Sequence, residues 1–131
     1  MNRNFLTIAA VFAALAVILG AFGAHALKAS VSPEKLQVFE TAVRYQFYHV
    51  FALMAAGMLF KEYPGQLLLW SGWLFIAGIV LFSGSLYALT FLPEDMKRIG
   101  IITPFGGAAF IAGWFCFAVA IISKKNNHTE F

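Results

Sequence analysis

Three long stretches without a charged side chain constrain this chain more than any other feature. Residues 4–27, 63–93 and 99–123 contain no Asp, Glu, Lys or Arg. Each stretch is at least as long as the ~20 residues that a helix needs to cross a bilayer. Charged residues make up 11% of the chain, whereas soluble domains carry roughly 25%. The sequence therefore predicts an all-α integral membrane protein.

A shorter uncharged stretch at residues 45–60 predicts a fourth membrane helix. The motif Ser32-Pro33-Glu34 is typical of a helix start, and Tyr63-Pro64-Gly65 is typical of a turn. We expect a four-helix bundle in a single membrane domain, residues 1–131, with helices at about 5–26, 33–60, 66–91 and 101–123. An even number of spans places both termini on the same side of the membrane. Apart from Arg44, the lysines and arginines are divided equally between the two sides, which leaves the orientation open.

The first apolar stretch has a second interpretation as a secretory signal. Arg3 precedes it, and Ala24-His25-Ala26 resembles a small-x-small cleavage site. The apolar stretch is longer than a typical signal core, so we expect the helix to be retained.

The first half of the second helix is unusually polar for a membrane span. Glu40, Arg44 and Tyr48 form one row at a spacing of four residues, and Tyr45 and His49 lie on the adjacent row. If Phe60 marks one membrane boundary, the helix rise places Arg44 about 5 Å and His49 about 12 Å inside the opposite boundary. Ionisable groups at such depths are costly and commonly mark a functional site.

Alternating the direction of the four spans brings further polar residues to the same end of the bundle. We therefore expect a polar vestibule on that face. Its predicted members, candidates for ligand binding or a proton relay, are His25, Glu40, Arg44, Tyr45, Tyr48, His49, Ser83, Ser85, Tyr87 and Thr103.

The charged residues of this set have more than one interpretation. Glu40 and Arg44 are predicted to form either a structural ion pair or a clamp for an anion. His49 is a candidate proton carrier, a metal or haem ligand, or a buried neutral imidazole bonded to a tyrosine or serine of another helix. A metal would need two or more further ligands, and on this side only His25 and Glu40 are available, so we expect no metal and no cofactor.

Other chemistries find little support in the sequence. The basic residues show no patch with interleaved aromatics, so no nucleic-acid partner is expected. Cys116 is the single cysteine, which excludes an internal disulfide. No serine has an evident base and acid nearby, so we do not expect a hydrolytic enzyme.

Four motifs resemble the YgdD/YwdK-like family of small, uncharacterised bacterial inner-membrane proteins, which has a eukaryotic transmembrane relative. They read Gly-Ala-Phe-Gly-Ala-His-Ala-Leu at 20–27, Phe-Glu-Thr-Ala-Val-Arg-Tyr-Gln-Phe-Tyr-His at 39–49, Phe-Ser-Gly-Ser-Leu-Tyr at 82–87 and Ile-Thr-Pro-Phe-Gly-Gly at 102–107. The resemblance covers about 5–123. It implies four membrane helices in a bacterial inner membrane and no established activity.

Three functions remain open at this stage. The leading hypothesis is a transport or polar-ligand-binding module, homo-oligomeric and surrounded by membrane lipids, that takes a small polar or anionic ligand. The second is a non-enzymatic assembly or scaffold subunit of a membrane complex, in which the polar groups hold helices together. The third is a metal, haem or quinone redox site using His25, His49 and tyrosines.

Overall fold

The computed structural model describes residues 1–128, and their side chains as far as Lys124. The elements, in chain order, are the helices α1 (Arg3–His25), η1 (Leu27–Ala29), α2 (Pro33–Leu59), α3 (Gln66–Gly78), η2 (Ile79–Ser83), α4 (Gly84–Phe91), η3 (Glu94–Ile101) and α5 (Ile102–His128). No strand occurs among the described residues. The predicted all-α class is therefore confirmed.

Local sequence signals account for the helix ends. The side chain of Asn2 accepts a hydrogen bond from the backbone N–H of Phe5 and caps α1. Ser32 caps α2 in the same way, accepting from the N–H of Lys35, with Pro33 at the first helical position. Gly65, at φ 140°, makes the turn into α3, in a backbone conformation that other residues rarely adopt.

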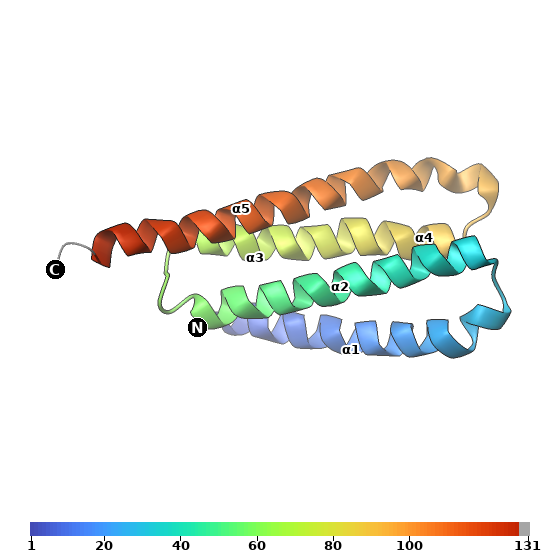
Figure 1. The fold of residues 1–131 in the computed structure, drawn as a ribbon, viewed down its shortest axis with the longest axis horizontal. Coiled ribbons are helices and arrows are strands. Elements are labelled where there is room, and N and C mark those ends of the chain that lie inside the picture. The colour runs from blue at the N-terminus through green and yellow to red at the C-terminus, as the bar shows by residue number, and fades with distance from the viewer. Residues whose placement is uncertain (129–131) are drawn as a thin grey trace.

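The long helices lie side by side and alternate in direction (Figure 1). The start of α1 and the end of α5 are at the left of this view, and the connections η1 and η3 are at the right. Helix α2 packs against α1, α3 and α4, while α5 packs against α3. The polar helix α2 is therefore in contact with apolar helices on several sides.

The third long helical segment, residues 66–91, is interrupted by a turn of π-helix. Within η2 the helix widens, and the N–H of Gly84 reaches back to the carbonyls of Ile79 and Leu81. This widening separates α3 from α4, where apolar periodicity alone predicts one continuous helix. Single π turns inside α-helices commonly occur at functional sites; here the turn carries Ser83, which bonds to α2.

Phenylalanine rings pack directly against glycines of facing helices, and these contacts allow the helices to lie close together. Phe5 of α1 lies against Gly72 of α3, Phe110 of α5 against Gly78, and Phe75 of α3 against Gly113 of α5. In each case the ring occupies the space that a Cβ atom would fill. Small residues at helix contacts let backbones approach closely in membrane bundles.

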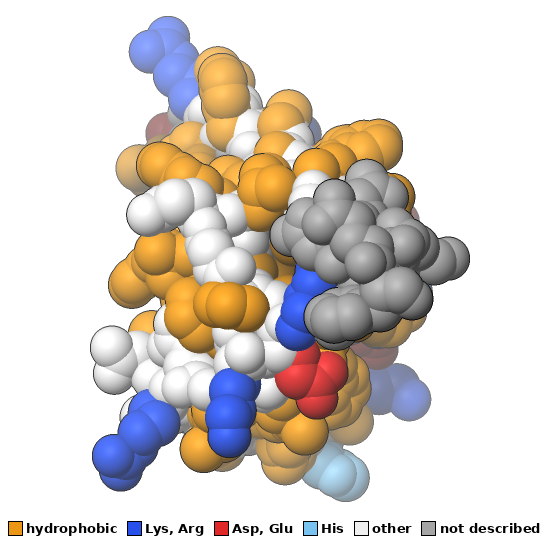
Figure 2. Space-filling model, turned by 90° about the vertical axis from the view of Figure 1, so that its left-hand side faces the viewer, with side chains coloured by type: hydrophobic (Ala, Val, Ile, Leu, Met, Phe, Trp, Pro, Cys, Tyr) orange, Lys and Arg blue, Asp and Glu red, His pale blue; other side chains and the backbone are white. Residues whose placement is uncertain are grey.

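The outer surface of the helices is largely apolar, as contact with lipid requires. Three helical segments among the described residues are long and apolar enough to cross a membrane: Arg3–Ala29, Gln66–Phe91 and Glu94–Lys124. Large apolar side chains such as Val17, Phe51 and Phe115 point outward. At the end of the molecule seen in Figure 2, Lys and Arg side chains project around the rim beside hydrophobic ones.

Two adjacent glycines at the start of α5 provide a test of this packing. A Cβ at Gly106 would collide with the backbone of Phe82, whereas one at Gly107 would make only an ordinary contact with the Phe82 ring. We expect Gly106→Ala to lower the free energy of unfolding by about 1–3 kcal/mol, the usual cost of overpacking. Gly107→Ala should change it by less than ~1 kcal/mol, because alanine also favours helix. Thermal unfolding in detergent would compare the two, and equal effects would contradict the packing described.

Candidate functional site

The buried stripe of α2 contains two polar side chains. Phe39, Ala42, Gln46, His49 and Leu53 follow one another at three- or four-residue spacing, and all five are buried. Gln46 is 4% exposed and His49 is 5% exposed. A buried polar group costs free energy unless it is hydrogen-bonded, so the partners of these two residues decide what they can do.

Gln46 connects α2 to two other helices at once. Its amide nitrogen donates to the carbonyl of Phe12 on α1, at 2.8 Å. Its amide oxygen accepts from the hydroxyl of Tyr87 on α4, at 2.7 Å. Both ends of the side chain are thus satisfied by groups from apolar helices.

His49 is held on both nitrogens and on one face of its ring. Trp114 of α5 donates its indole N–H to Nε2 at 3.1 Å, and Nδ1 lies 2.8 Å from the carbonyl of Tyr45. Because indole can only donate, Nε2 must be the acceptor and the proton must reside on Nδ1. The ring stacks on Phe110, with centroids 3.5 Å apart and planes at 8°. This is a neutral imidazole bonded to its own helix and to α5, and its interhelical partner is a tryptophan where the sequence predicted a tyrosine or serine.

Hydroxyl groups make three further connections between helices. Ser83 donates to the carbonyl of Ala42 at 2.8 Å, and Ser71 donates to the carbonyl of Gly113 at 2.9 Å. Ser85 of α4 and Thr103 of α5 share a hydrogen bond of 2.5 Å. Among the described residues, every buried side-chain nitrogen or oxygen has a partner. The interior polar groups are therefore used to join helices.

The side chains of the other predicted site residues lie outside this network. Glu40, Arg44, Tyr48 and His25 are exposed. The side chain of Tyr45 is also exposed and lies beside Phe82, and Tyr45 joins the network only through its backbone carbonyl. Glu40 and Arg44 do not form the ion pair that their spacing predicts; in the described part of the chain the ion pair found is Glu94–Lys97. Their row faces outward, so each side chain is free to turn away from the other.

Arg44 and Glu40 border a groove between α1 and α2. The groove has a volume of about 250 Å³, and Gly20, Gly23 and Ala24 line its α1 side. These small residues leave room beside the guanidinium of Arg44. The sequence predicted a single polar vestibule. In the structure its residues fall into two groups: buried side chains that hydrogen-bond between helices, and Glu40 and Arg44 at an outer groove.

Sequence reasoning did not select Gln46, Trp114 and Phe110 as site residues. The spacing Phe39, Ala42, Gln46, His49 was a usable signal, because it places Gln46 on the stripe that small and apolar residues share. No comparable signal pointed from His49 to Trp114, which lies 65 residues away in the sequence.

The residues described offer no evident metal centre. No group of three or more His, Cys, Asp or Glu side chains lies close enough together to hold an ion within this part of the chain. Cys116 is a half-buried free thiol.

Apolar spanning helices joined by buried polar bonds define a multi-pass membrane protein. The chain belongs to the family described as "Protein of unknown function (DUF423)", whose pattern matches residues 19–107. It is 44% identical over 121 residues to the UPF0382 membrane protein YwdK of Bacillus subtilis (strain 168), covering 92% of this chain and 97% of the relative. This confirms the resemblance seen in the sequence.

Further relatives carry the same description. A UPF0382 membrane protein of Staphylococcus aureus (strain bovine RF122 / ET3-1) is 43% identical over 118 residues, which cover 90% of this chain and 94% of the relative. One from Staphylococcus saprophyticus is 43% identical over 117 residues, covering 89% and 95%. No solved structure matches the chain.

The bond between Gln46 and Tyr87 can be measured with a double-mutant cycle. Gln46→Leu and Tyr87→Phe should each destabilise the protein, by about 1–3 kcal/mol where a buried group loses its partner. The double variant should cost less than the sum, with a coupling of about 0.6 kcal/mol, the average for membrane hydrogen bonds, and at most about 1.7 kcal/mol.

The matched control pairs Tyr87→Phe with Ser71→Ala. The hydroxyl of Ser71 bonds elsewhere, to Gly113, so these two effects should add. Strict additivity of the Gln46 and Tyr87 variants would show that the bond does not form.

Proposed function

We propose that this protein is a non-catalytic membrane module that binds an anionic ligand in the groove between α1 and α2, with Arg44 as the anchor. The observation that carries the proposal is an exposed guanidinium beside a groove lined by small residues, with no ion-pair partner among the described side chains. Arginine presents a planar fork of donors that matches phosphate or carboxylate oxygens.

The membrane arrangement that we propose makes α2 the fourth span. It runs beside three helices that are apolar enough to span and is about as long as they are. A helix packed alongside them over that length would share their depth in the bilayer. The result would be a four-helix bundle in the cell membrane with both termini on the same side.

In this arrangement, the depth of Arg44 in the bilayer indicates which kind of anion it would bind. Arg44 would lie about 5 Å below the hydrocarbon boundary, within reach of the headgroup layer for a long side chain. Lipid phosphate groups are the anions found at that level. Glu40, one turn nearer the water, adds a negative charge at the outer end of the groove. We therefore take the ligand to be an anionic headgroup whose phosphate reaches Arg44.

The interior contacts favour binding over proton relay. A relay through His49 would require the ring to release the Trp114 N–H or the Tyr45 carbonyl during each transfer. The stacked Phe110 would also resist rotation of the ring. These contacts support a structural role for His49, and they leave the groove as the place where a ligand can enter without breaking bonds.

Native mass spectrometry of the full chain, released from nanodiscs that contain phosphatidylglycerol, would test the proposal. We expect Arg44→Gln to weaken phosphatidylglycerol retention about tenfold, which corresponds to about 1.4 kcal/mol, near the value of one hydrogen bond to a charged group. Arg44→Lys should show an intermediate loss, because it keeps the charge without the fork. Arg3→Gln, an exposed arginine at the opposite end of α1, is the matched control.

The same spectra separate the competing explanations. Unchanged lipid retention in Arg44→Gln would contradict the proposal. If the mass of the oligomer changed instead, the face would be an assembly surface, as expected of a scaffold subunit. A soluble phosphate ester that displaced the lipid would identify a free anion as the ligand.

A further inference from the structure

A second groove lies at the start of η3, between the start of α2 and the end of α4. Its volume is about 350 Å³. One part of its lining is apolar and includes Val38, Leu89 and Leu92. The groove shares no lining residue with the Arg44 groove. The following inference is therefore independent of the function proposed above.

The remaining lining residues bring two cations and two carboxylates together. Lys35 and Glu34 come from the first turn of α2, and Glu94 and Lys97 come from η3. These four charges sum to zero. A ligand that pairs both with Lys35 and with the carboxylates would carry a negative and a positive group.

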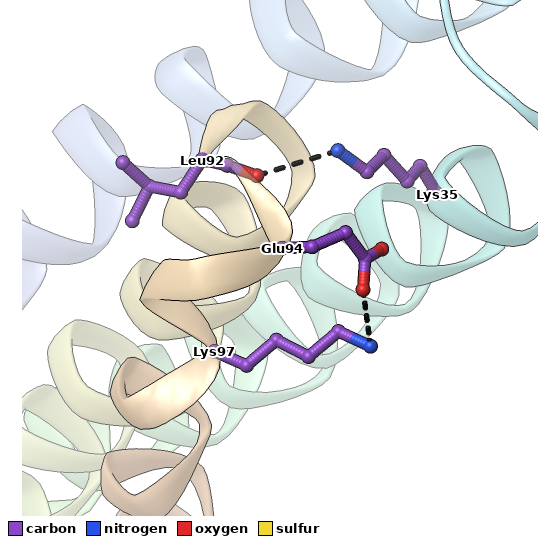
Figure 3. A network of polar contacts seen from close by, with 4 residues as sticks. All are labelled: Lys35, Leu92, Glu94 and Lys97. Atoms are coloured by element: carbon purple, nitrogen blue, oxygen red, sulfur yellow. Dashed lines mark hydrogen bonds and ion pairs between the residues drawn. The ribbon is translucent and has the colours of Figure 1, made fainter.

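Figure 3 shows the contacts that Lys35 and Glu94 make at this groove. The ammonium of Lys35 donates to the carbonyl of Leu92 at 3.3 Å, which fixes it at the groove and uses one of its three N–H groups. Glu94 pairs with Lys97 through one carboxylate oxygen, at 2.5 Å. No hydrogen bond or ion pair within the described residues uses the other oxygen of Glu94 or the carboxylate of Glu34.

We propose that this groove binds a phospholipid whose headgroup carries a phosphate and a primary ammonium, as in phosphatidylethanolamine. The phosphate accepts from the free N–H groups of Lys35. The ammonium donates to the carboxylates of Glu34 and Glu94. The glycerol and the first acyl carbons lie against the apolar wall of Val38, Leu89 and Leu92.

The charge pattern sets the selectivity among lipids. A choline headgroup has the same charges, but its quaternary nitrogen has no N–H to donate to a carboxylate. A glycerol headgroup is anionic and leaves both carboxylates without a cation. The groove should therefore favour the primary ammonium over both alternatives.

The test uses the full chain in nanodiscs with equal amounts of phosphatidylethanolamine, phosphatidylcholine and phosphatidylglycerol of identical acyl chains. Native mass spectrometry gives the ratio of bound lipids. We expect ethanolamine to exceed choline by about threefold, because exposed ion pairs contribute little each. In the double variant Glu34→Gln, Glu94→Gln this ratio should fall to about one. Lys35→Met should lower retention of all three lipids at the groove.

Matched variants distinguish this site from the Arg44 groove. Glu62→Gln, at an exposed carboxylate of the opposite end, should keep the preference. Arg44→Gln should lower only phosphatidylglycerol, so failure of either proposal leaves the other standing. Circular dichroism and elution volume would show that each variant is folded. A wild-type protein without preference for ethanolamine, or a folded double variant that keeps it, would overturn the inference.

Discussion

The structure depends on hydrogen-bond satisfaction of the polar side chains that α2 carries into the bundle. A buried amide or imidazole without a partner would cost several kcal/mol in an apolar environment. Gln46 and His49 avoid that cost by bonding to groups of α1, α4 and α5. The same bonds fix the position of α2 relative to three apolar helices. These hydrogen bonds therefore contribute both to the stability of the bundle and to the arrangement of its helices.

Close backbone approach makes these bonds possible. Phe5, Phe75 and Phe110 each fit against a glycine of a facing helix, which brings the helices near enough for short side chains to reach. Ser71 of α3 can then donate directly to the backbone carbonyl of Gly113 on α5. Larger residues at those glycines would separate α3 from α1 and α5 and would lengthen the bond that Ser71 makes. The small residues thus allow the close helix contacts that the interhelical hydrogen bonds require.

The sequence predicts the apolar helices and some of their ends, but it does not predict which side chains bond between helices. Charge-free stretches identify apolar spanning helices because lipid excludes charge over a length set by the bilayer, and Ser32-Pro33 marks a helix start through local bonds. The partners Gln46–Tyr87 and His49–Trp114 could not be predicted, since they depend on the rotation of each helix about its axis. The π turn at Ile79–Ser83 also has no signal in apolar periodicity. Glu40 and Arg44 have the spacing of an ion pair, yet their outward position lets them separate.

The division between inward and outward groups supports the central proposal, that α2 is a fourth membrane span whose interior polar side chains are satisfied by its neighbours. Spin-label accessibility along its outer face tests this claim most directly, in a Cys116→Ala background. A nitroxide at Phe51→Cys, a position 60% exposed, should collide with oxygen far more than with a water-soluble nickel reagent. A nitroxide at Gln37→Cys should show the reverse. Access of the nickel reagent along the whole outer face would contradict the account.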